Sequence, residues 1–596
     1  MRNDPALHGY GAPLIGTRHP FLSERNLEVQ SSRIYPGDGL PITIKKNTDE
    51  PEGNPGEMML DEEALQVIKD YHERTKHRFS AYAKGPEFLD WDDQPNPFRS
   101  FSGTQITRLS LSPGLPQRAY SDLFNPEKKI PAPAFDLNSI SILLEVSLGL
   151  SAWKSYAGTR WSLRCNPSSG NLHPTEAYLI TPDISGLPGG VYHYLSRDHL
   201  LERRNIPEGS LWGKAWKTPG VILGLSSIYW REAWKYGERA FRYCQHDVGH
   251  AIAAIRFAAS AMGWDASLLD GWKDEMISRL TGTGRHHEFP ENENEAPEVL
   301  LWIGDLLIPP DPSLLLEAVD SGTWEGKASK LSPEHLRWTV IGEADLATRN
   351  HCAPQKDLFP QTSLPPLKAT ASVLSSGQLF RQRRSAQRFD PNGEPLSKPE
   401  FLRILDALLP RKKVPPFDIL PWVPRIHPLF FVYKVEGVEA GCYLLARNSE
   451  VEERIAQSLG PDFGIRKAEG IPEHIPLRLL MRGDTRNFVG NLCCRQAIAS
   501  QSLFAVAMIS EFEDSLKKGP WWYRRLFWEA GVLGQSLYLE AEAAGVRGTG
   551  IGCFFDDELH SWLGLSGREF QSLYHFTIGR PLEDPRLETS PPYPSA

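Results

Sequence analysis

The feature of this chain that most constrains its fold is an internal repeat. When the segment that begins at Val221 is shifted by a constant offset onto the segment around Phe504, five identical pairs align: Lys235 with Lys517, Gly237 with Gly519, Arg242 with Arg524, Gly249 with Gly531, and Gly263 with Gly545. Self-similarity of this kind marks a structural unit that occurs more than once. One hydrophobic core rarely organises more than about 250 residues, and this chain has 596. We therefore predict a tandem duplication whose halves pack together as an internal pseudo-dimer.

The repeat sets the expected domain boundaries. Residues 1–65 are rich in Pro, Gly, Asn and charged residues, and such a composition buries too little apolar surface to offset the entropy of ordering, so we predict an irregular arm. The first domain is expected at 66–308 and the second at 373–596. Between them, residues 309–372 begin with three prolines in four positions and are predicted to be a linker, with room for a short helix around 333–347.

Both halves show the same order of predicted elements. Apolar spacing and composition indicate an amphipathic helix, two strands, a long helix ended by glycine, and a last strand. The ranges in the first and second halves are helices 140–150 and 398–409, strands 176–181 and 429–434, strands 221–226 and 505–510, long helices 238–262 and 523–544, and strands 299–303 and 573–578. This mixture predicts an α+β fold, with long helices packed on a sheet.

Charge and composition exclude several classes of partner. The 65 Lys and Arg residues are interleaved with 74 Asp and Glu residues, and no long basic run is present to neutralise a phosphate backbone, so we expect no nucleic acid partner. No stretch approaches the roughly 20 apolar residues of a membrane helix. The N-terminus does not resemble a signal peptide, and the seven cysteines contain no C-x-x-C pair. We therefore expect a cytoplasmic protein that does not enter a membrane.

Two motifs of the second half could contact a ligand. The stretch Arg381 to Phe389 holds four arginines and Ser385, a set that suits a phosphate ester because guanidinium groups donate in pairs to oxyanions; a solvated basic turn is the alternative. Gly548, Gly550 and Gly552 alternate after a helix, which matches neither a dinucleotide fingerprint nor a phosphate loop. The bare backbone of these glycines would let N–H groups approach a planar ligand, although a flexible loop explains them equally well.

Two motifs of the first half have competing interpretations. The segment from Arg164 to Glu176 places many small polar residues in a turn before a strand, which indicates a polar ligand edge or turn chemistry alone. His246 and His250 lie one helical turn apart, a spacing that could hold a metal ion. They lack the glutamate of a zinc protease motif and an obvious third ligand, so core or surface histidines are the favoured interpretation.

Several strings together resemble the SagB-type dehydrogenase branch of the nitroreductase superfamily. They are YHERTKHR, NPSSGNLHPTEAYLI, GGVYHYLSRDHLLERR and EAWKYGERAFRYCQHDVGHA in the first half, with RRSAQRF, the Gly545 to Gly552 region and HFTIGRPLEDPR in the second. The resemblance covers roughly residues 70–305 and 375–590. It implies an α+β fold that binds FMN non-covalently between two domains, usually in a homodimer, which the tandem repeat would supply within one chain.

The resemblance also implies roles for particular residues. FMN phosphate and ribityl contacts fall on Arg383, Arg384, Ser385 and Gln387, the last of these at a position that is often basic. The flavin N5 edge would face the backbone of Gly550, Ile551 and Gly552. A second phosphate clamp would be Arg580 or Arg586. The opposite domain would contribute Pro167, Ser168, Ser169, Gly170 and Asn171.

An adjacent Lys235-Tyr236 pair resembles the pair that azoline-oxidising relatives use for proton transfer. A desolvated lysine can act as a base near neutral pH, and a tyrosine can relay a proton. The second half has Lys517-Lys518 at the matching place and so lacks the tyrosine. A surface lysine beside a packing tyrosine is the alternative interpretation.

The halves are expected to differ in flavin binding. The constant offset places Ala266, Leu268 and Asp270 opposite the three glycines. When Ile303-Gly304 is aligned with Ile578-Gly579, Asp305 is the counterpart of Arg580, and a carboxylate there would repel a phosphate. Arg74, Thr75, Lys76 and His77 form a partial phosphate site in the first half. We therefore predict one FMN, held by the second half and covered by the first.

The predicted activity is two-electron transfer between FMN and a small-molecule or peptide substrate. Azoline dehydrogenation is one candidate reaction and NAD(P)H is one candidate electron donor. A flavin-binding protein without turnover is the main alternative, followed by a metal enzyme built on His246 and His250.

Overall fold

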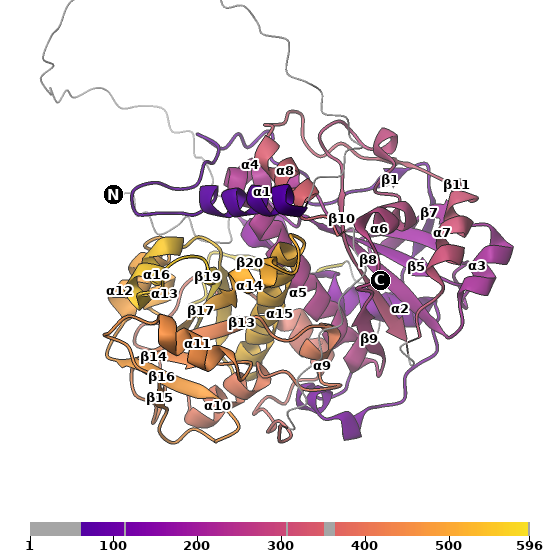
Figure 1. The fold of residues 1–596 in the computed structure, drawn as a ribbon. Helices are drawn as coiled ribbons and strands as arrows, with labels where there is room; N and C mark the ends of the chain where they lie inside the picture. Colours follow the sequence, from indigo (N-terminus) through magenta and orange to yellow (C-terminus); the bar gives the residue numbers. More distant parts are fainter. Residues whose placement is uncertain (1–60, 112–114, 305–307, 351–363, 594–596) are drawn as a thin grey trace, which may run out of the picture.

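The computed structural model describes residues 61–111, 115–304, 308–350 and 364–593, and its main elements include two large antiparallel sheets (Figure 1). The first sheet has the order β11-β7-β6-β5-β8-β10-β9, with β2 also paired to β7; the second has the order β15-β16-β14-β13-β17-β19-β18. The bounds are β2 Gln105–Arg108, β5 Thr175–Thr181, β6 Gly190–Leu195, β7 Leu200–Ile206, β8 Gly220–Ser227, β9 Asp265–Leu268, β10 Ala296–Gly304, β11 Thr323–Trp324, β13 Ile426–Val432, β14 Gly441–Leu445, β15 Arg466–Lys467, β16 Leu477–Arg482, β17 Phe504–Glu511, β18 Arg547–Ile551 and β19 Phe570–Gly579.

The two sheets repeat each other strand by strand. The central strands β5, β8 and β10 of the first sheet stand where β13, β17 and β19 stand in the second, and the edge strands β9 and β18 also correspond. The predicted amphipathic helices are α2 (Leu137–Ser147) and α10 (Lys398–Ala407), and the long ones are α5 (Ala240–Ala261) and α15 (Trp522–Ala543). The α+β prediction is confirmed, and the matching strand orders support the duplication.

Both faces of each sheet are covered, which explains why the strands are apolar on both sides. In β8, Val221 and Leu223 pack toward the central helices, whereas Ile222 packs toward an outer layer, as expected for side chains that alternate along a strand. The outer layer of the first sheet includes α3 (Gly209–Ala215), α6 (Asp274–Thr281) and α7 (Pro312–Asp320). That of the second includes α11 (Val451–Ser458), α12 (Arg486–Leu492), α13 (Ala497–Ser500) and α16 (Asp556–Leu563).

The long helices α5 and α15 lie side by side between the sheets and form the centre of the molecule (Figure 1). Every residue of both helices is buried. They approach most closely at Gly249 and Gly531, where a Cβ added to Gly249 would lie 2.3 Å from the carbonyl oxygen of Trp528 and 2.9 Å from the Cα of Gly531. A Cβ added to Gly531 would lie 2.3 Å from the carbonyl oxygen of His246. This pair of glycines, aligned by the repeat, therefore permits contact between the two helix backbones.

Strand pairing and ion pairs between distant segments also join the two halves. The C-terminal strand β20 (Glu588–Ser590) pairs with β3 (Leu150–Tyr156) of the first half, which pairs with β4 (Thr159–Arg164). Arg239 and Arg242, before and on α5, both form ion pairs with the buried Asp556 of the second half, at 2.9 and 2.7 Å. These contacts make the two repeats one folded unit.

Two sequence predictions need correction in part. The segment 309–372 was predicted to be an irregular linker, but it contains α7, β11, β12 (Lys327–Ala328) and α8 (Thr339–Ala347), which is the expected short helix. Leu315 and Val319 of α7 are fully buried under the first sheet, which explains why α7 is ordered. Most of the predicted N-terminal arm lies outside the described residues, and residues 61–65 open helix α1 (Asp61–Arg74) instead of being irregular. The domain boundaries themselves remain predictions.

The remaining elements are short. They are β1 (Phe101–Ser102), α4 (Tyr229–Tyr236), α9 (Ser376–Gln382) and α14 (Phe512–Leu516). Among the described helices, none has the length and apolar character needed to cross a bilayer.

The glycine contact predicts a strong effect of small substitutions. Gly249→Ala or Gly531→Ala places a methyl group against main-chain atoms that cannot rotate away, and overpacking of this kind costs about 1–3 kcal/mol. We expect both variants to unfold at a lower temperature than the wild type by thermal denaturation. The matched control is Gly213→Ala in α3, an exposed helical glycine whose added Cβ meets no atom within 4 Å. That control should leave stability unchanged or raise it slightly. Melting of all three variants at the wild-type temperature would contradict the close packing.

Candidate active site

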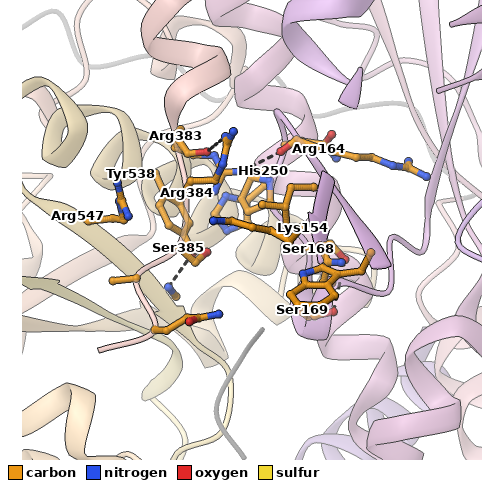
Figure 2. Close-up of a pocket in the computed structure, with 18 of the residues that line it drawn as sticks. Lys154, Arg164, Ser168, Ser169, His250, Arg383, Arg384, Ser385, Tyr538 and Arg547 are labelled. Atoms are coloured by element: carbon orange, nitrogen blue, oxygen red, sulfur yellow. Dashed lines mark hydrogen bonds between the residues drawn. The ribbon is translucent and has the colours of Figure 1, made fainter. Parts of the chain in front are cut away.

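A cavity of about 340 Å³ lies between the two halves (Figure 2). The first half lines it with β3, β4, the turn after β4, and α5; the second half lines it with the segment after α9, α15, β18, β19 and the chain after β19. The residues from the first half are Lys154, Trp161, Leu163, Arg164, Asn166, Pro167, Ser168, Ser169, Asn171, His173, Asp247 and His250. Its size is within the range of small-molecule sites, about 300–1,000 Å³.

Arg383 joins the halves at this cavity. Its Nε and Nη2 donate to the carbonyl oxygens of Cys165 and Arg164, at 3.2 and 2.8 Å, and its guanidinium carbon lies 5.0 Å from the centroid of the Tyr538 ring. Only 3% of the residue is exposed, and this burial lowers the pKa of its guanidinium. The side chain therefore fixes the position of the turn after β4 relative to α15.

Arg384 caps the end of α9. Its Nη1 donates to the carbonyl oxygens of Arg381 and Arg383, both at 2.7 Å, and its Nη2 donates to the carbonyl oxygen of Ser151 in β3 at 3.2 Å. Burial lowers its pKa to about 10, so it stays charged at neutral pH. The next residue, Ser385, places its Oγ 2.8 Å from the hydroxyl of Tyr538, and both lie at the cavity wall, as does Gln387.

Positive charge exceeds negative charge in the lining. Two of the cations come from separate strands and were not predicted from sequence: Lys154 in β3, which donates to Thr589 Oγ1 at 2.7 Å, and Arg547 in β18, which pairs with Glu542 at 3.3 Å and with Glu583. The lining cations are Lys154, Arg164, Arg383, Arg384 and Arg547, against the carboxyl groups of Asp247 and Glu583. Such a surface favours an anionic ligand group, for example a phosphate ester.

The three alternate glycines belong to strand β18 and the residue after it rather than to a flexible loop. Gly550 lines the cavity and donates its N–H to the hydroxyl of Tyr538 at 3.0 Å. A Cβ at Gly550 would lie 1.9 Å from the hydroxyl of Tyr574, so no side chain fits there. Ile551 is fully buried, and the carbonyl of Gly552 accepts from Arg239 at 3.1 Å. Neither of these two residues lines the cavity.

The turn after β4 is held by a buried carboxyl group on α5. The N–H and Oγ of Ser169 donate to Asp247 at 3.0 and 3.1 Å. Burial raises the pKa of Asp247 to about 7, while the hydrogen bonds from Ser168 and Ser169 act in the opposite direction. Pro167, Ser168 and Asn171 also line the cavity. Asp247 was not predicted as a site residue because a single Asp within a long, largely apolar helix gives no sequence signal of its own.

Gly170 faces the predicted Lys-Tyr pair instead of the first cavity. A Cβ at Gly170 would lie 2.6 Å from the hydroxyl of Tyr236. Gly170 and Lys235 line a second cavity of about 320 Å³, which shares Trp161 and Asn171 with the first. Lys235 Nζ lies 5.3 Å from the centroid of the Tyr236 ring, and burial lowers the pKa of the lysine. A lysine in this state can accept a proton more readily near neutral pH.

The structure places Arg580 and Arg586 away from the cavity. Arg580 donates to the carbonyl oxygens of Glu394 and Pro395, both at 3.2 Å, and Arg586 pairs with Asp584 at 2.6 Å on the exposed surface. The chain between them nevertheless lines the cavity through Pro581, Leu582 and Glu583.

The two histidines of α5 are packed in the core. His246 stacks on Tyr574 with ring centroids 4.2 Å apart, and His250 Nε2 lies 3.1 Å from the hydroxyl of Tyr574. In the described part of the chain, no three or more His, Cys, Asp or Glu residues are grouped so as to hold a metal ion.

The partial phosphate site of the first half is paired with carboxylates. Arg74 pairs with Glu238 at 2.6 Å, and Lys76 pairs with Glu73 and Asp557 at 2.9 and 2.8 Å. The backbone N–H of His77 donates to Asp556. A phosphate could bind to these residues only by displacing the carboxylates that pair with them.

Comparison with known proteins gives partial sequence matches. No family model matches the chain. It is 33% identical over 156 residues to trifolitoxin-processing protein TfxB of Rhizobium leguminosarum bv. trifolii. The matched region covers 24% of this chain and 41% of that protein. It is also 26% identical over 121 residues to a candidate nitroreductase of Methanocaldococcus jannaschii. That matched region covers 19% of this chain and 61% of the relative. The chain thus spans less than two thirds of each relative.

A solved structure extends the likeness over both halves. The crystal structure of a candidate nitroreductase from Anabaena variabilis matches with a TM-score of 0.61 and 22% sequence identity, covering 87% of this chain and 99% of that chain. The resemblance to the nitroreductase superfamily indicated by the sequence motifs is confirmed, and this chain has the nitroreductase fold.

Proposed function

We propose that this protein is an FMN-dependent oxidoreductase that acts on a small-molecule or peptide substrate, with the flavin in the cavity between the halves. The observation that carries the proposal is the cation-rich cavity formed jointly by the two repeats at the predicted phosphate motif. The nitroreductase fold supports it, as do relatives named as nitroreductases. A bound flavin would supply two-electron redox chemistry, while the protein supplies binding and orientation.

The cavity has groups that fit FMN. Arg164 Nε and Asn166 Oδ1 are buried there without a hydrogen-bond partner, so it offers both an unused donor and an unused acceptor. Arg384, Ser385, Lys154, Gln387 and Arg547 would hold the phosphate and ribityl groups. Arg383 would act mainly as a positioning residue, because it is buried and its Nε and Nη2 are bonded to carbonyls. Arg384 also donates to carbonyls, but it is only partly buried at the cavity wall.

A peptide substrate is supported by one relative. TfxB is named for processing trifolitoxin, and the partial match to it supports a peptide substrate for this chain. In that case Lys235 Nζ would accept a proton from the substrate, and azoline dehydrogenation would be the candidate reaction. NAD(P)H remains a candidate electron donor. A flavin-binding protein without turnover is the alternative, which a flavin that no substrate or nicotinamide reduces would favour.

The proposal predicts that the purified protein is yellow and takes up about one FMN per chain. Arg384→Glu and Lys154→Glu should each weaken FMN binding at least about 100-fold, because a charge reversal near a phosphate changes the interaction by several kcal/mol. Arg586→Glu, at the exposed surface, is the matched control and should bind normally. Fluorescence titration with FMN measures the FMN affinity of the wild type and the three variants. Colourless wild-type protein that takes up no added FMN would refute the proposal, and two FMN per chain would refute the single site.

Asp247 predicts how FMN binding depends on pH. Its pKa is raised to about 7, so it is mostly neutral below pH 7 and becomes a buried anion above it. Because that anion shares the cavity with the phosphate, FMN affinity should fall as pH rises from about 6 to 8. Asp247→Asn should remove most of this fall. An identical pH dependence in the two proteins, measured by FMN titration, would exclude Asp247 as its source.

The proton-transfer role predicts a specific defect. Lys235→Ala should keep its fold and FMN content but lose substrate-dependent flavin reduction at least about 100-fold, the range typical of general-base loss. In the wild type, the rate should rise with pH until the lysine is neutral, since only the unprotonated amine accepts a proton. Lys214→Ala, an exposed lysine on α3, is the control. Full turnover of Lys235→Ala with a substrate that reduces wild-type flavin would remove this residue from the mechanism.

A further inference from the structure

The second cavity is walled by aromatic rings. Its lining includes the four indoles of Trp91, Trp153, Trp161 and Trp234, together with Phe98. Trp91 and Trp234 meet edge to face with ring centroids 5.3 Å apart. The indole N–H groups of Trp153 and Trp234 donate to the carbonyl oxygens of Pro592 and Asp90, both at 2.9 Å, which fixes the two rings. Trp91 is 41% exposed, so apolar surface is available to a ligand.

The charge of this cavity has one sign. Lys235 and Arg160 line it, and no Asp or Glu does. Arg160 stacks on Trp153 with its guanidinium carbon 4.2 Å from the ring centroid. The carboxyl group of Glu232, one helical turn before Lys235, is buried with neither oxygen hydrogen-bonded, and burial raises its pKa far above the usual range. Glu232 is not among the residues that line the cavity, and its interaction with Lys235 acts to raise the pKa of the lysine, against the effect of burial.

These features select among ligand classes. Aromatic walls alone would suit a cationic ligand such as a quaternary ammonium. Arg160 is a permanent cation with no carboxylate beside it in the lining, so it repels such a ligand and attracts an anion, and Lys235 adds to this attraction when it is protonated. The side-chain amides of Gln94 and Asn171 lie in the same wall and can interact with peptide groups. The volume of about 320 Å³ is at the lower end of ligand sites, so one ring with its neighbouring groups fills it.

We propose that the second cavity binds a peptide segment in which an aromatic side chain stands next to a carboxylate, such as an aromatic C-terminal residue. The shared walls at Trp161 and Asn171 put this segment beside the first cavity. The role of the second cavity as the specificity site for the substrate rests on the proposed function. Binding of the peptide segment in that cavity does not.

Isothermal titration calorimetry of the full chain tests the binding directly. The probes are N-acetyl-phenylalanine, which carries a carboxylate, and its neutral amide. We expect saturable 1:1 binding of the acid at least tenfold more tightly than the amide. Trp91→Ala should weaken binding of both probes. The exposed Arg160→Gln should remove most of the preference for the acid, and Lys235→Gln should reduce it most at low pH, where the lysine is protonated. Lys214→Gln, an exposed lysine outside the cavity, should bind like the wild type.

The outcomes separate this proposal from the proposed function. Equal affinity for acid and amide, or a preference that persists in both Lys235→Gln and Arg160→Gln, would overturn the inference. Protein that binds FMN but neither probe would overturn it and leave the flavin proposal standing. Protein that binds the acid selectively but no FMN would support this site while refuting the flavin proposal.

Discussion

The backbone contact between Gly249 and Gly531 is the interaction on which the rest of the structure depends. Because neither residue has a side chain, α5 and α15 approach until main-chain atoms of one helix meet those of the other. The same two helices carry cavity residues: Asp247 and His250 lie within one turn of Gly249, and Tyr538 lies two turns beyond Gly531. A change in helix separation would therefore change the cavity walls on both sides at once.

Duplication provides symmetry in the scaffold but not in the charges. The strand orders of the two sheets match, so the fold offers two comparable positions between the halves. At one position, Lys154, Arg384 and Arg547 surround a cavity. At the other, Arg74 and Lys76 are neutralised by carboxylates. If the local charges, rather than the backbone fold, decide where an anionic cofactor binds, a chain with two repeats has one working site.

Much of the scaffold could be predicted from sequence because buried strands and long helices leave strong apolar patterns, as in 221–226 and 523–544. Helix α7 was missed because Pro309 and Pro310 indicate a loop, although Pro312 in the first turn of a helix is tolerated. The cluster around Arg383 and Arg384 was visible because its members are adjacent in sequence. Their position on FMN remains a prediction.

The rest of the site depends on contacts between distant segments. Lys154 and Arg547 stand alone in their strands, and only pairing of β20 with β3 and packing of β18 bring them to one cavity. Asp247 lies in a helix whose residues are all buried, so its contact with the cavity could not be predicted from the sequence. Arg580 and Arg586 follow the last strand of the sheet as expected, but the chain turns their side chains outward while Pro581 to Glu583 face the cavity.

We propose that one flavin lies between the repeats. A crystal structure of the full chain saturated with FMN tests it most directly. We expect density for a single flavin in the cavity, with its phosphate among Lys154, Arg384 and Arg547 and with the turn at Ser168 and Ser169 on its other side. A flavin bound elsewhere, a second flavin at the Arg74 and Lys76 position, or an empty cavity under saturating FMN would contradict it.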